Sequence, residues 1–226
     1  MNNIKRNLAL FDLDNTLLAG DSDYNWSLFL INEGLLDAKT HHDRNEQFYA
    51  DYKVGSLNID AFLKFQLHPL SQHKRAFLDA LHVKYMQNVI RPMMTVKAQA
   101  LINRHKAAND LCIIITATNS FVTKPIATAF GIEHLIGTEP EIVNGEFTGG
   151  VSGIPSFQQG KVIRMNEWLN ARGQQLSDYE KSYFYSDSHN DLPLMKLVSD
   201  PVAVDADETL TQYAIDHGWF QISLRG

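Results

Sequence analysis

The sequence has only one cysteine, Cys112, and no apolar run long enough to span a bilayer. A lone cysteine forms no intramolecular disulfide, and its place within the apolar run LCIII is typical of a buried strand. The N-terminal sequence MNNIKRNLAL has too short an apolar segment for a secretory signal. These absences argue against a disulfide-stapled or membrane-bound protein, and we expect a cytoplasmic chain.

The sequence also lacks a cluster of basic residues. Its 20 Lys and Arg residues are scattered and are outnumbered by 26 Asp and Glu residues, so the formal net charge is −6. Nucleic acids and anionic membranes are bound through concentrated positive charge, so neither is an expected partner. A small solute is the expected partner, and no pattern in the sequence indicates an oligomeric state.

What the sequence does contain is an alternation of short apolar runs with helical patterns. The apolar runs predict buried strands at residues 8–11, 111–116, 182–186 and 201–205. Helical patterns flank the last three of them, at residues 93–110, 120–131, 160–173 and 191–199. Such alternation predicts an α/β fold with a doubly wound parallel sheet.

A long helical insertion separates the first two predicted strands. Residues 21–90 contain several amphipathic helical patterns and no convincing strand, and they are too many for a simple crossover. We therefore predict a core domain of residues 1–20 and 90–226 and a helical cap domain of residues 21–89. A small hairpin is predicted around residues 144–145, where Asn precedes Gly.

Polar residues that suit one reaction follow the predicted strands. Ligands of open α/β sheets bind beyond the carboxyl ends of the strands, so these residues are expected to share one site. Several carboxylates in one place repel one another unless a cation is bound, and oxygen ligands suit Mg²⁺. With a lysine and a hydroxyl nearby, such a site binds phosphate. The residues are Asp12, Asp14, Thr116, Lys161, Asp187 and Asp191.

Four segments in order resemble the motifs of the haloacid dehalogenase superfamily: FDLDNT, the threonine of IIITATN, the lysine of QGKVIR, and YSDSHNDLP. The cap inserted between the first two motifs is similar to that of the phosphoserine-phosphatase-like branch. The resemblance implies a Rossmann-like core and a Mg²⁺-dependent phosphatase that hydrolyses small phosphomonoesters through an aspartyl-phosphate.

The resemblance also implies a role for each motif residue. Asp12 would be the nucleophile, and Asp14 the general acid that protonates the leaving alcohol and then activates water. The implied metal ligands are Asp12, Asp14 through its backbone carbonyl, Asp187 and Asp191. The implied phosphate contacts are Thr116, Ala117, Lys161 and Asn190.

Substrate choice is expected to depend on residues near the cap. Asp21 is either the partner of a substrate ammonium group, as the resemblance implies, or the N-cap of the first cap helix. Asn119 is expected to shape the pocket floor, and Arg44 is a candidate for binding a carboxylate, although it lacks the context found in phosphoserine phosphatases. An amine without a carboxylate suits this pattern.

Histidinol phosphate is such a compound, and the segments FDLDNTLLAGDSD and YSDSHNDLPLM resemble a bacterial subgroup linked to histidinol-phosphate phosphatase. Phosphoserine, or a broad range of small phosphomonoesters, is the alternative. A receiver domain of phosphorelay signalling also carries aspartates, a threonine and a lysine, but it has no helical insertion. A phosphotransferase would be recognised by the absence of free phosphate as product.

The cap helices repeat aromatic residues at helical spacing, which indicates packing rather than ligand binding. The residues concerned are Trp26, Phe29, Phe62, Phe65 and Phe77. The sequence HHD at residues 41–43 has no partner at a metal-binding spacing, so we expect it on the solvated surface of the cap.

Overall fold

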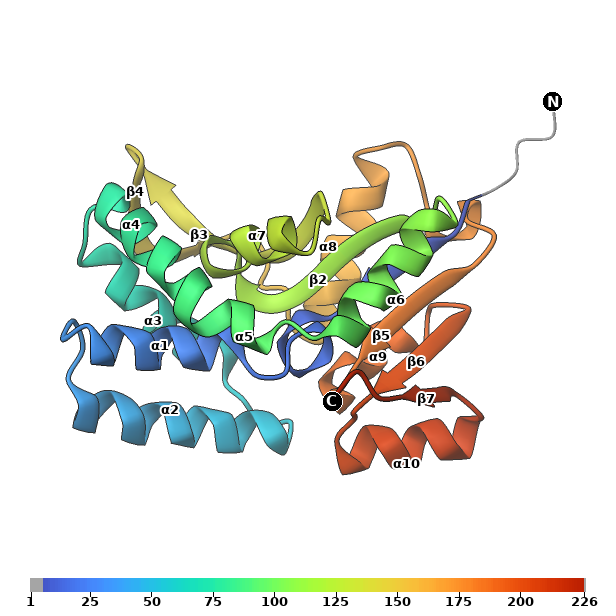
Figure 1. Cartoon of the computed structure of the whole chain (residues 1–226), viewed down its shortest axis with the longest axis horizontal. Helices are drawn as coiled ribbons and strands as arrows, with labels where there is room; N and C mark the ends of the chain where they lie inside the picture. The colour runs from blue at the N-terminus through green and yellow to red at the C-terminus, as the bar shows by residue number, and fades with distance from the viewer. Residues whose placement is uncertain (1–5, 226) are drawn as a thin grey trace.

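Seven strands form one sheet in the computed structural model, which describes residues 6–225 (Figure 1). The strand order is β4-β3-β2-β1-β5-β6-β7, and all neighbouring strands are parallel except the antiparallel pair β3 and β4. The predicted fold class is confirmed. The strands are β1 (Leu8–Phe11), β2 (Leu111–Asn119), β3 (His134–Val143), β4 (Glu146–Ser152), β5 (Ser182–Ser186), β6 (Asp200–Val204) and β7 (Phe220–Ile222).

The four predicted strands correspond to β1, β2, β5 and β6, and the predicted hairpin is the β3–β4 pair. Asn144 and Gly145 both have positive φ, at 53° and 82°, which suits their place at the tip of the hairpin. Two features of the sheet were not predicted from the sequence: the strand β7 and the parallel pairing of β3 with β2. The sheet is therefore wider at both edges than predicted.

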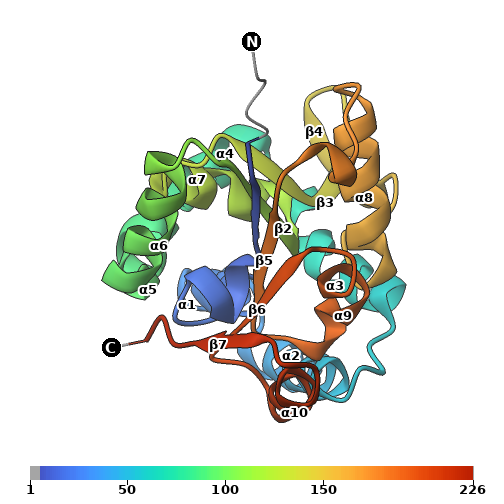
Figure 2. The same cartoon turned by 90° about the vertical axis from the view of Figure 1, so that its right-hand side faces the viewer.

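Helices cover both faces of the sheet (Figure 2). On β1, Ala9 and Phe11 belong to the apolar cluster of one face, while Leu8 and Leu10 belong to that of the other. This alternation follows from the two-residue period of a strand. The helices of the two faces are α6 (Val96–Ala107) and α7 (Ser120–Ala129) on one side, and α8 (Gln159–Asn170), α9 (Leu192–Met195) and α10 (Glu208–His217) on the other.

The segment between β1 and β2 is helical, as predicted, and its helices gather at one end of the sheet (Figure 1). The backbone stays helical from α4 through a turn at Met86–Ile90 into α5, so it crosses the predicted domain boundary at residues 89–90 without a break. The helices are α1 (Ser22–Asn32), α2 (Ala38–Lys53), α3 (Ile59–Ser71), α4 (Arg75–Tyr85) and α5 (Arg91–Met93).

The β3–β4 hairpin supports the inserted helices. The backbone of Gly149 lies so close to α3 that an added Cβ would lie 3.3 Å from the side chain of Ser71. At the start of α4, the Arg75 N–H donates to Glu146 Oε2 over 2.7 Å. These contacts join α3 and α4 to the sheet through its β4 edge.

Most of the predicted aromatic packing is present, with three corrections. Phe62 packs on Phe48 but also lines the cavity described below, so its interpretation as packing alone is wrong. Trp26 and Phe29 are buried, but Phe77 is 44% exposed because it lies on the outer side of α4 beside His73. The prediction of a solvated His41 is also wrong, because its ring stacks on Phe65 with the centroids 4.3 Å apart. Aromatic spacing alone therefore did not separate the inner from the outer positions of these helices.

No helix within residues 6–225 combines the length and the hydrophobicity that a membrane span requires. The expectation about a secretory signal concerns in part residues 1–5, which lie outside the described residues. Cys112 is buried in β2, as predicted.

Candidate active site

The carboxyl ends of three neighbouring strands position the predicted site. Asp12 follows β1, and its backbone N–H donates to the carbonyl of Tyr185 in β5 over 2.9 Å. The pairing of β2 with β3 is irregular between Ile115 and Asn119, the stretch that contains the predicted phosphate contacts of β2. Lys161 lies in the first turn of α8. Residues distant in sequence thus meet at one edge of the sheet.

Lys161 lies between two carboxylates. Its Nζ is 2.7 Å from Asp12 Oδ1 and 2.7 Å from the carboxylate of Asp191, and all three side chains are buried. Ser186 Oγ also donates to Asp191 over 2.7 Å. Burial raises the pKa of Asp12 to about 7, even though the charge of Lys161 acts to lower it. One lysine therefore does not compensate both carboxylates.

Thr16 connects Asp12 to Asp187. Its Oγ1 lies 3.3 Å from Asp12 Oδ2 and 3.0 Å from Asp187 Oδ1, and it accepts the backbone N–H of Asp187. Burial and the charge of Asp12 raise the pKa of Asp187 well above its usual range. Within residues 6–225, no three carboxylate or imidazole groups converge as a ready-made set of metal ligands. Thr16, the last residue of FDLDNT, had no role assigned from the sequence.

Asp14 is held through both of its carboxylate oxygens. Oδ1 accepts the backbone N–H of Ser22 over 2.6 Å, and Oδ2 accepts the hydroxyl of Thr118 over 2.8 Å. Thr116 Oγ1 lies 3.3 Å from the same Oδ2. Burial and the charge of Asp21 raise the pKa of Asp14 to about 6. A carboxyl group with that pKa can both give and take a proton near neutral pH.

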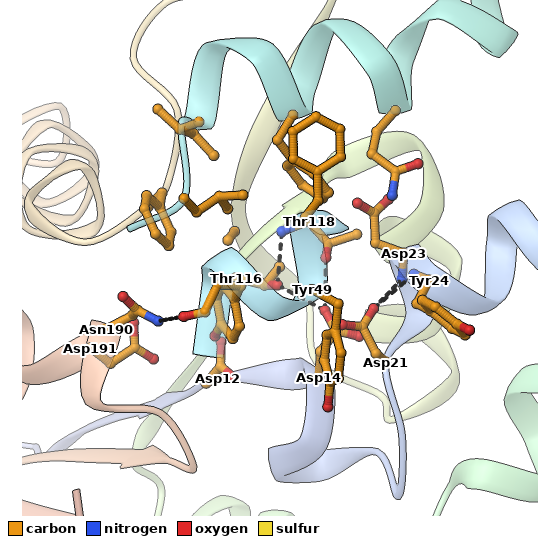
Figure 3. A pocket seen from close by; sticks show the side chains of 18 of the residues that line it. Asp12, Asp14, Asp21, Asp23, Tyr24, Tyr49, Thr116, Thr118, Asn190 and Asp191 are labelled. Carbon is orange, nitrogen blue, oxygen red and sulfur yellow. Dashed lines mark hydrogen bonds between the residues drawn. The ribbon is translucent and has the colours of Figure 1, made fainter. Parts of the chain in front are cut away.

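A cavity lies above these groups. We use two names for its lining. The floor consists of the lining residues within 12–14 and 116–191. The roof consists of the lining residues within 21–66, which lie on α1, α2, α3 and their connections. Figure 3 shows Asp12, Asn190 and Asp191 on one side of the cavity and Asp23 and Tyr24 on the other. The cavity is thus enclosed between the sheet and the inserted helices.

The lining is strongly negative. Lys161 is the one Lys or Arg among the described residues that line the cavity, against five aspartates. Asp21 caps α1, since its Oδ1 accepts the N–H groups of Asp23 and Tyr24 over 2.8 and 2.9 Å, and it lines the cavity as well. The N-cap interpretation of Asp21 is therefore confirmed, and its position still permits contact with a substrate.

The other predicted residues have different surroundings. Thr116 and Ala117 line the cavity. Asn190 also lines it, but its Nδ2 donates to the carbonyl of Tyr52 over 3.0 Å and lies 3.3 Å from Ser188 Oγ, so both of its N–H groups have protein partners. A phosphate contact from Asn190 requires it to leave one of them.

Two of the predicted specificity residues do not line the cavity. Asn119 lies behind Asp23, where its Oδ1 caps α7 by accepting the N–H of Val122 over 3.1 Å. Arg44 is exposed on α2, and its guanidinium lies over the outer side of the Phe48 ring, 4.7 Å from the centroid. Phe48, rather than Arg44, is the residue that reaches the cavity.

The roof contains polar residues that sequence reasoning missed. Asp23, Asn45 and Gln66 had no binding role assigned from the sequence, yet all three are buried and line the cavity. They come from α1, α2 and α3, and no motif connects them. The available signal was polar residues on the apolar faces of three amphipathic helices.

The chain belongs to the haloacid dehalogenase-like hydrolase family, whose pattern matches residues 9–196. This match covers most of the chain and confirms the predicted family. It also favours a hydrolase over the alternative of a phosphorelay receiver. The chain is therefore an enzyme, a phosphatase of this family, as predicted.

Among proteins of known name, the chain is similar to the histidinol-phosphatase of Neisseria meningitidis serogroup C (strain 8013). The two are 46% identical over 215 residues, which is 95% of this chain and 97% of the relative. A crystal structure of a protein of unknown function from Bordetella pertussis Tohama I is also 46% identical, with a TM-score of 0.93 over 98% of this chain and 100% of that one.

A substrate-bound phosphoserine phosphatase structure has the same fold. Its TM-score is 0.69 at 17% identity, over 96% of this chain and 93% of that chain. At that identity the likeness concerns the fold alone.

Proposed function

We propose that this protein hydrolyses a small phosphomonoester that carries an amine, with histidinol phosphate as the leading candidate. The observation that carries the proposal is the composition of one cavity. Asp12, Asp14 and Lys161 line its floor, aspartates line its roof, and among the described residues no arginine lines it. The floor suits the phosphoryl group of a substrate. The roof suits a substrate that carries a cationic group and no carboxylate.

The reaction would begin at Asp12. Its carboxylate forms a bond to phosphorus as the ester oxygen leaves, and Asp14 gives its proton to that oxygen. A water molecule then attacks phosphorus in the aspartyl-phosphate, and Asp14 takes the proton of that water. The bond from phosphorus to Asp12 breaks, and inorganic phosphate is released. The pKa of Asp14, about 6, allows both proton transfers.

The side chains of Lys161 and Thr116 would position the phosphoryl oxygens during both steps. Lys161 Nζ is 2.7 Å from Asp12 Oδ1, so a phosphoryl group bonded to Asp12 comes within its reach. Thr116 Oγ1 lies 3.3 Å from Asp14 Oδ2. Positive charge and hydroxyl donors aimed at the transferring group stabilise the charge that develops on it.

The oxygen donors at the floor fit a divalent cation such as Mg²⁺ by their chemistry, although within residues 6–225 no three carboxylates converge on one point. Burial raises the pKa values of Asp12, Asp14 and Asp187, and Asp187, which is not among the lining residues, is joined to Asp12 through Thr16. A bound cation would favour the charged carboxylates, and hard oxygen ligands are those that Mg²⁺ prefers. By the pattern of the family, Asp12, Asp187, Asp191 and the backbone carbonyl of Asp14 would hold it. When bound, the cation would neutralise phosphoryl charge.

The test is the release of inorganic phosphate from histidinol phosphate and from O-phosphoserine, with Mg²⁺ present. We expect histidinol phosphate to have the higher kcat/KM by at least about tenfold, since the carboxylate of phosphoserine would meet aspartates in the roof. A higher value for O-phosphoserine would favour the alternative of a phosphoserine phosphatase. Substrate consumed without free phosphate would instead indicate a phosphotransferase.

A further inference from the structure

The roof contains buried polar side chains that take no part in the proposed chemical steps, and we call Asp23, Asn45 and Gln66 the roof cluster because all three line the cavity. Each of the three is at most 5% exposed. Ser27 Oγ donates to Gln66 Oε1 over 2.8 Å, and Gln66 Nε2 donates to Asn45 Oδ1 over 3.2 Å. The chain of hydrogen bonds fixes the orientation of the Asn45 amide at the cavity wall.

Two groups of this cluster have hydrogen-bonding capacity left. In the part of the chain that the structure describes, Asn45 Nδ2 donates to no protein group. Asp23 has one contact, from Asn119 Nδ2 to its Oδ1, and at 3.4 Å that contact is at the long limit of a hydrogen bond. Buried polar groups without partners are costly, so a buried donor and a buried acceptor at a cavity wall indicate a ligand.

The electrostatic surroundings of Asp23 favour a cationic or N–H-bearing ligand. Burial and the charges of Asp21 and Asp14 raise the pKa of Asp23 well above its usual range. The roof lining contains no Lys or Arg within residues 6–225. The protein alone thus favours the uncharged acid, and an N–H donor or a cation supplied by the substrate would favour the carboxylate that accepts the hydrogen bond.

The position of Asp23 separates it from the reacting groups. Figure 3 shows it on the side of the cavity away from Asp12 and Asp191, with Asp14 and Asp21 between. Aromatic residues of α2 and α3 complete this part of the lining, and the rings of Phe48 and Phe62 pack edge to face with centroids 5.4 Å apart. Aromatic walls around one acceptor and one donor suit a flat nitrogen-containing ring.

We propose that Asp23 is a specificity-determining residue that accepts a hydrogen bond from a nitrogen ring at the end of the substrate opposite the phosphate. Asn45 Nδ2 supplies the donor for the second ring nitrogen. An imidazole needs this pair of contacts, since its neutral form has one N–H and one acceptor nitrogen. The inference rests on the proposed function and adds a second subsite to it, distinct from the ammonium contact at Asp21.

The experiment compares Asp23→Asn with the wild type on two substrates, histidinol phosphate and 2-aminoethyl phosphate. Both carry phosphate and an ammonium group, but only the first has a ring. We expect the kcat/KM of the variant for histidinol phosphate to fall about thirtyfold, mainly through a higher KM. A loss of this size corresponds to one lost hydrogen bond to a charged group. For 2-aminoethyl phosphate we expect a change of less than about threefold.

The matched control is Asp43→Asn, which removes an exposed carboxylate from α2 and should leave kcat/KM unchanged for both substrates. Thermal unfolding separates a specificity role from a structural one. Asparagine has nearly the same shape as aspartate and carries no buried charge beside Asp14 and Asp21, so the midpoint of Asp23→Asn should equal or exceed that of the wild type.

Two further outcomes keep the proposals apart. A wild type that does not prefer histidinol phosphate over 2-aminoethyl phosphate overturns the substrate proposal and the ring subsite with it. A wild type that does prefer it, with equal losses on both substrates in Asp23→Asn or with no loss at all, overturns the ring subsite alone. An equal loss with a lowered midpoint would identify Asp23 as a structural residue.

Discussion

The floor and the roof of the cavity differ in how their polar groups are held. In the floor, Lys161 has two contacts of 2.7 Å, and both oxygens of Asp14 have partners. In the roof, Asn45 Nδ2 has no partner within residues 6–225, and the side chain of Asp23 has one long contact there. Groups already fixed by the protein suit a constant reaction, whereas groups with free capacity suit recognition of a ligand. We therefore expect the sheet to hold the chemistry and the inserted helices to select the substrate.

The largest effect is expected from Asp12→Asn in the floor. Without the carboxylate, no aspartyl-phosphate forms, so we expect kcat to fall at least about a thousandfold on every substrate. Phosphate release and circular dichroism of the same preparation are the measurements. A folded variant that keeps more than a tenth of the activity would show that another residue is the nucleophile.

Gly160→Ala should be the next most severe change, because it disturbs the position of Lys161. A Cβ at Gly160 would lie 2.0 Å from the carbonyl oxygen of Pro155, so the start of α8 must shift. A displacement of about 1 Å at an active site costs about a hundredfold in rate. We expect such a loss in kcat.

Gly150→Ala is the control for this change, since its added Cβ would meet side-chain atoms of Glu141 and Thr148. Unchanged kinetics in Gly160→Ala would mean that the floor tolerates movement of α8, which would weaken the contrast between floor and roof.

Asp21→Asn tests the roof and should give a smaller, selective effect. Asparagine is as good an N-cap as aspartate, so α1 should remain capped and the unfolding free energy should change by less than about 0.5 kcal/mol. The lost charge should lower kcat/KM about tenfold for histidinol phosphate and leave phenyl phosphate unchanged. A parallel loss on phenyl phosphate would mean that Asp21 acts on the floor, through Asp14.

The smallest effect concerns stability where the inserted helices meet the core. His82 of α4 is 3% exposed, and its Nε2 lies 2.9 Å from the carbonyl oxygen of Val122 in α7. Burial lowers the pKa of His82 from the 6.5 of a solvated imidazole. The unfolded chain therefore takes up a proton at a higher pH than the folded chain, and stability depends on pH at this residue.

This difference in pKa fixes the direction in which stability changes with pH. The contribution of His82 is complete above pH 6.5 and is lost as the pH falls below it, by at most about 1.4 kcal/mol per pH unit. Denaturant unfolding between pH 5 and pH 8 measures the slope. His82→Gln should flatten it, while His42→Gln, at an exposed position on α2, should not. Equal slopes for wild type and His82→Gln would contradict the assignment.

The floor could be predicted from the sequence because its residues are adjacent to strands. Asp12 and Thr116 lie at the ends of short apolar runs, and Lys161 lies in the first turn of a helix after a glycine-containing loop, so topology alone brings them together. The two features of the sheet that were missed, β7 and the pairing of β3 with β2, lack this signal. β7 has three residues, all exposed, and β3 changes from a parallel to an antiparallel partner around Pro140.

The roof could not be predicted because its residues meet only through helix packing. Asp23, Asn45 and Gln66 lie on three helices whose relative rotation is not encoded in any local pattern. From the sequence, a polar residue on a helix is expected to face solvent, because the position of the neighbouring helix is not known. The same limit explains Arg44, which the sequence offered as a binding residue and the structure leaves outside the cavity.

The most direct test of the division between floor and roof is the ratio of kcat/KM for histidinol phosphate to that for phenyl phosphate in the wild-type protein. Both esters present the same phosphoryl group to the floor, and phenoxide is the better leaving group, so a ratio above one in favour of histidinol phosphate reports the roof. We predict a ratio of about a hundred, equal to about 2.7 kcal/mol of differential transition-state binding. A ratio near one, with both activities abolished in Asp12→Asn, would leave the chemistry of the floor intact and contradict selection by the roof.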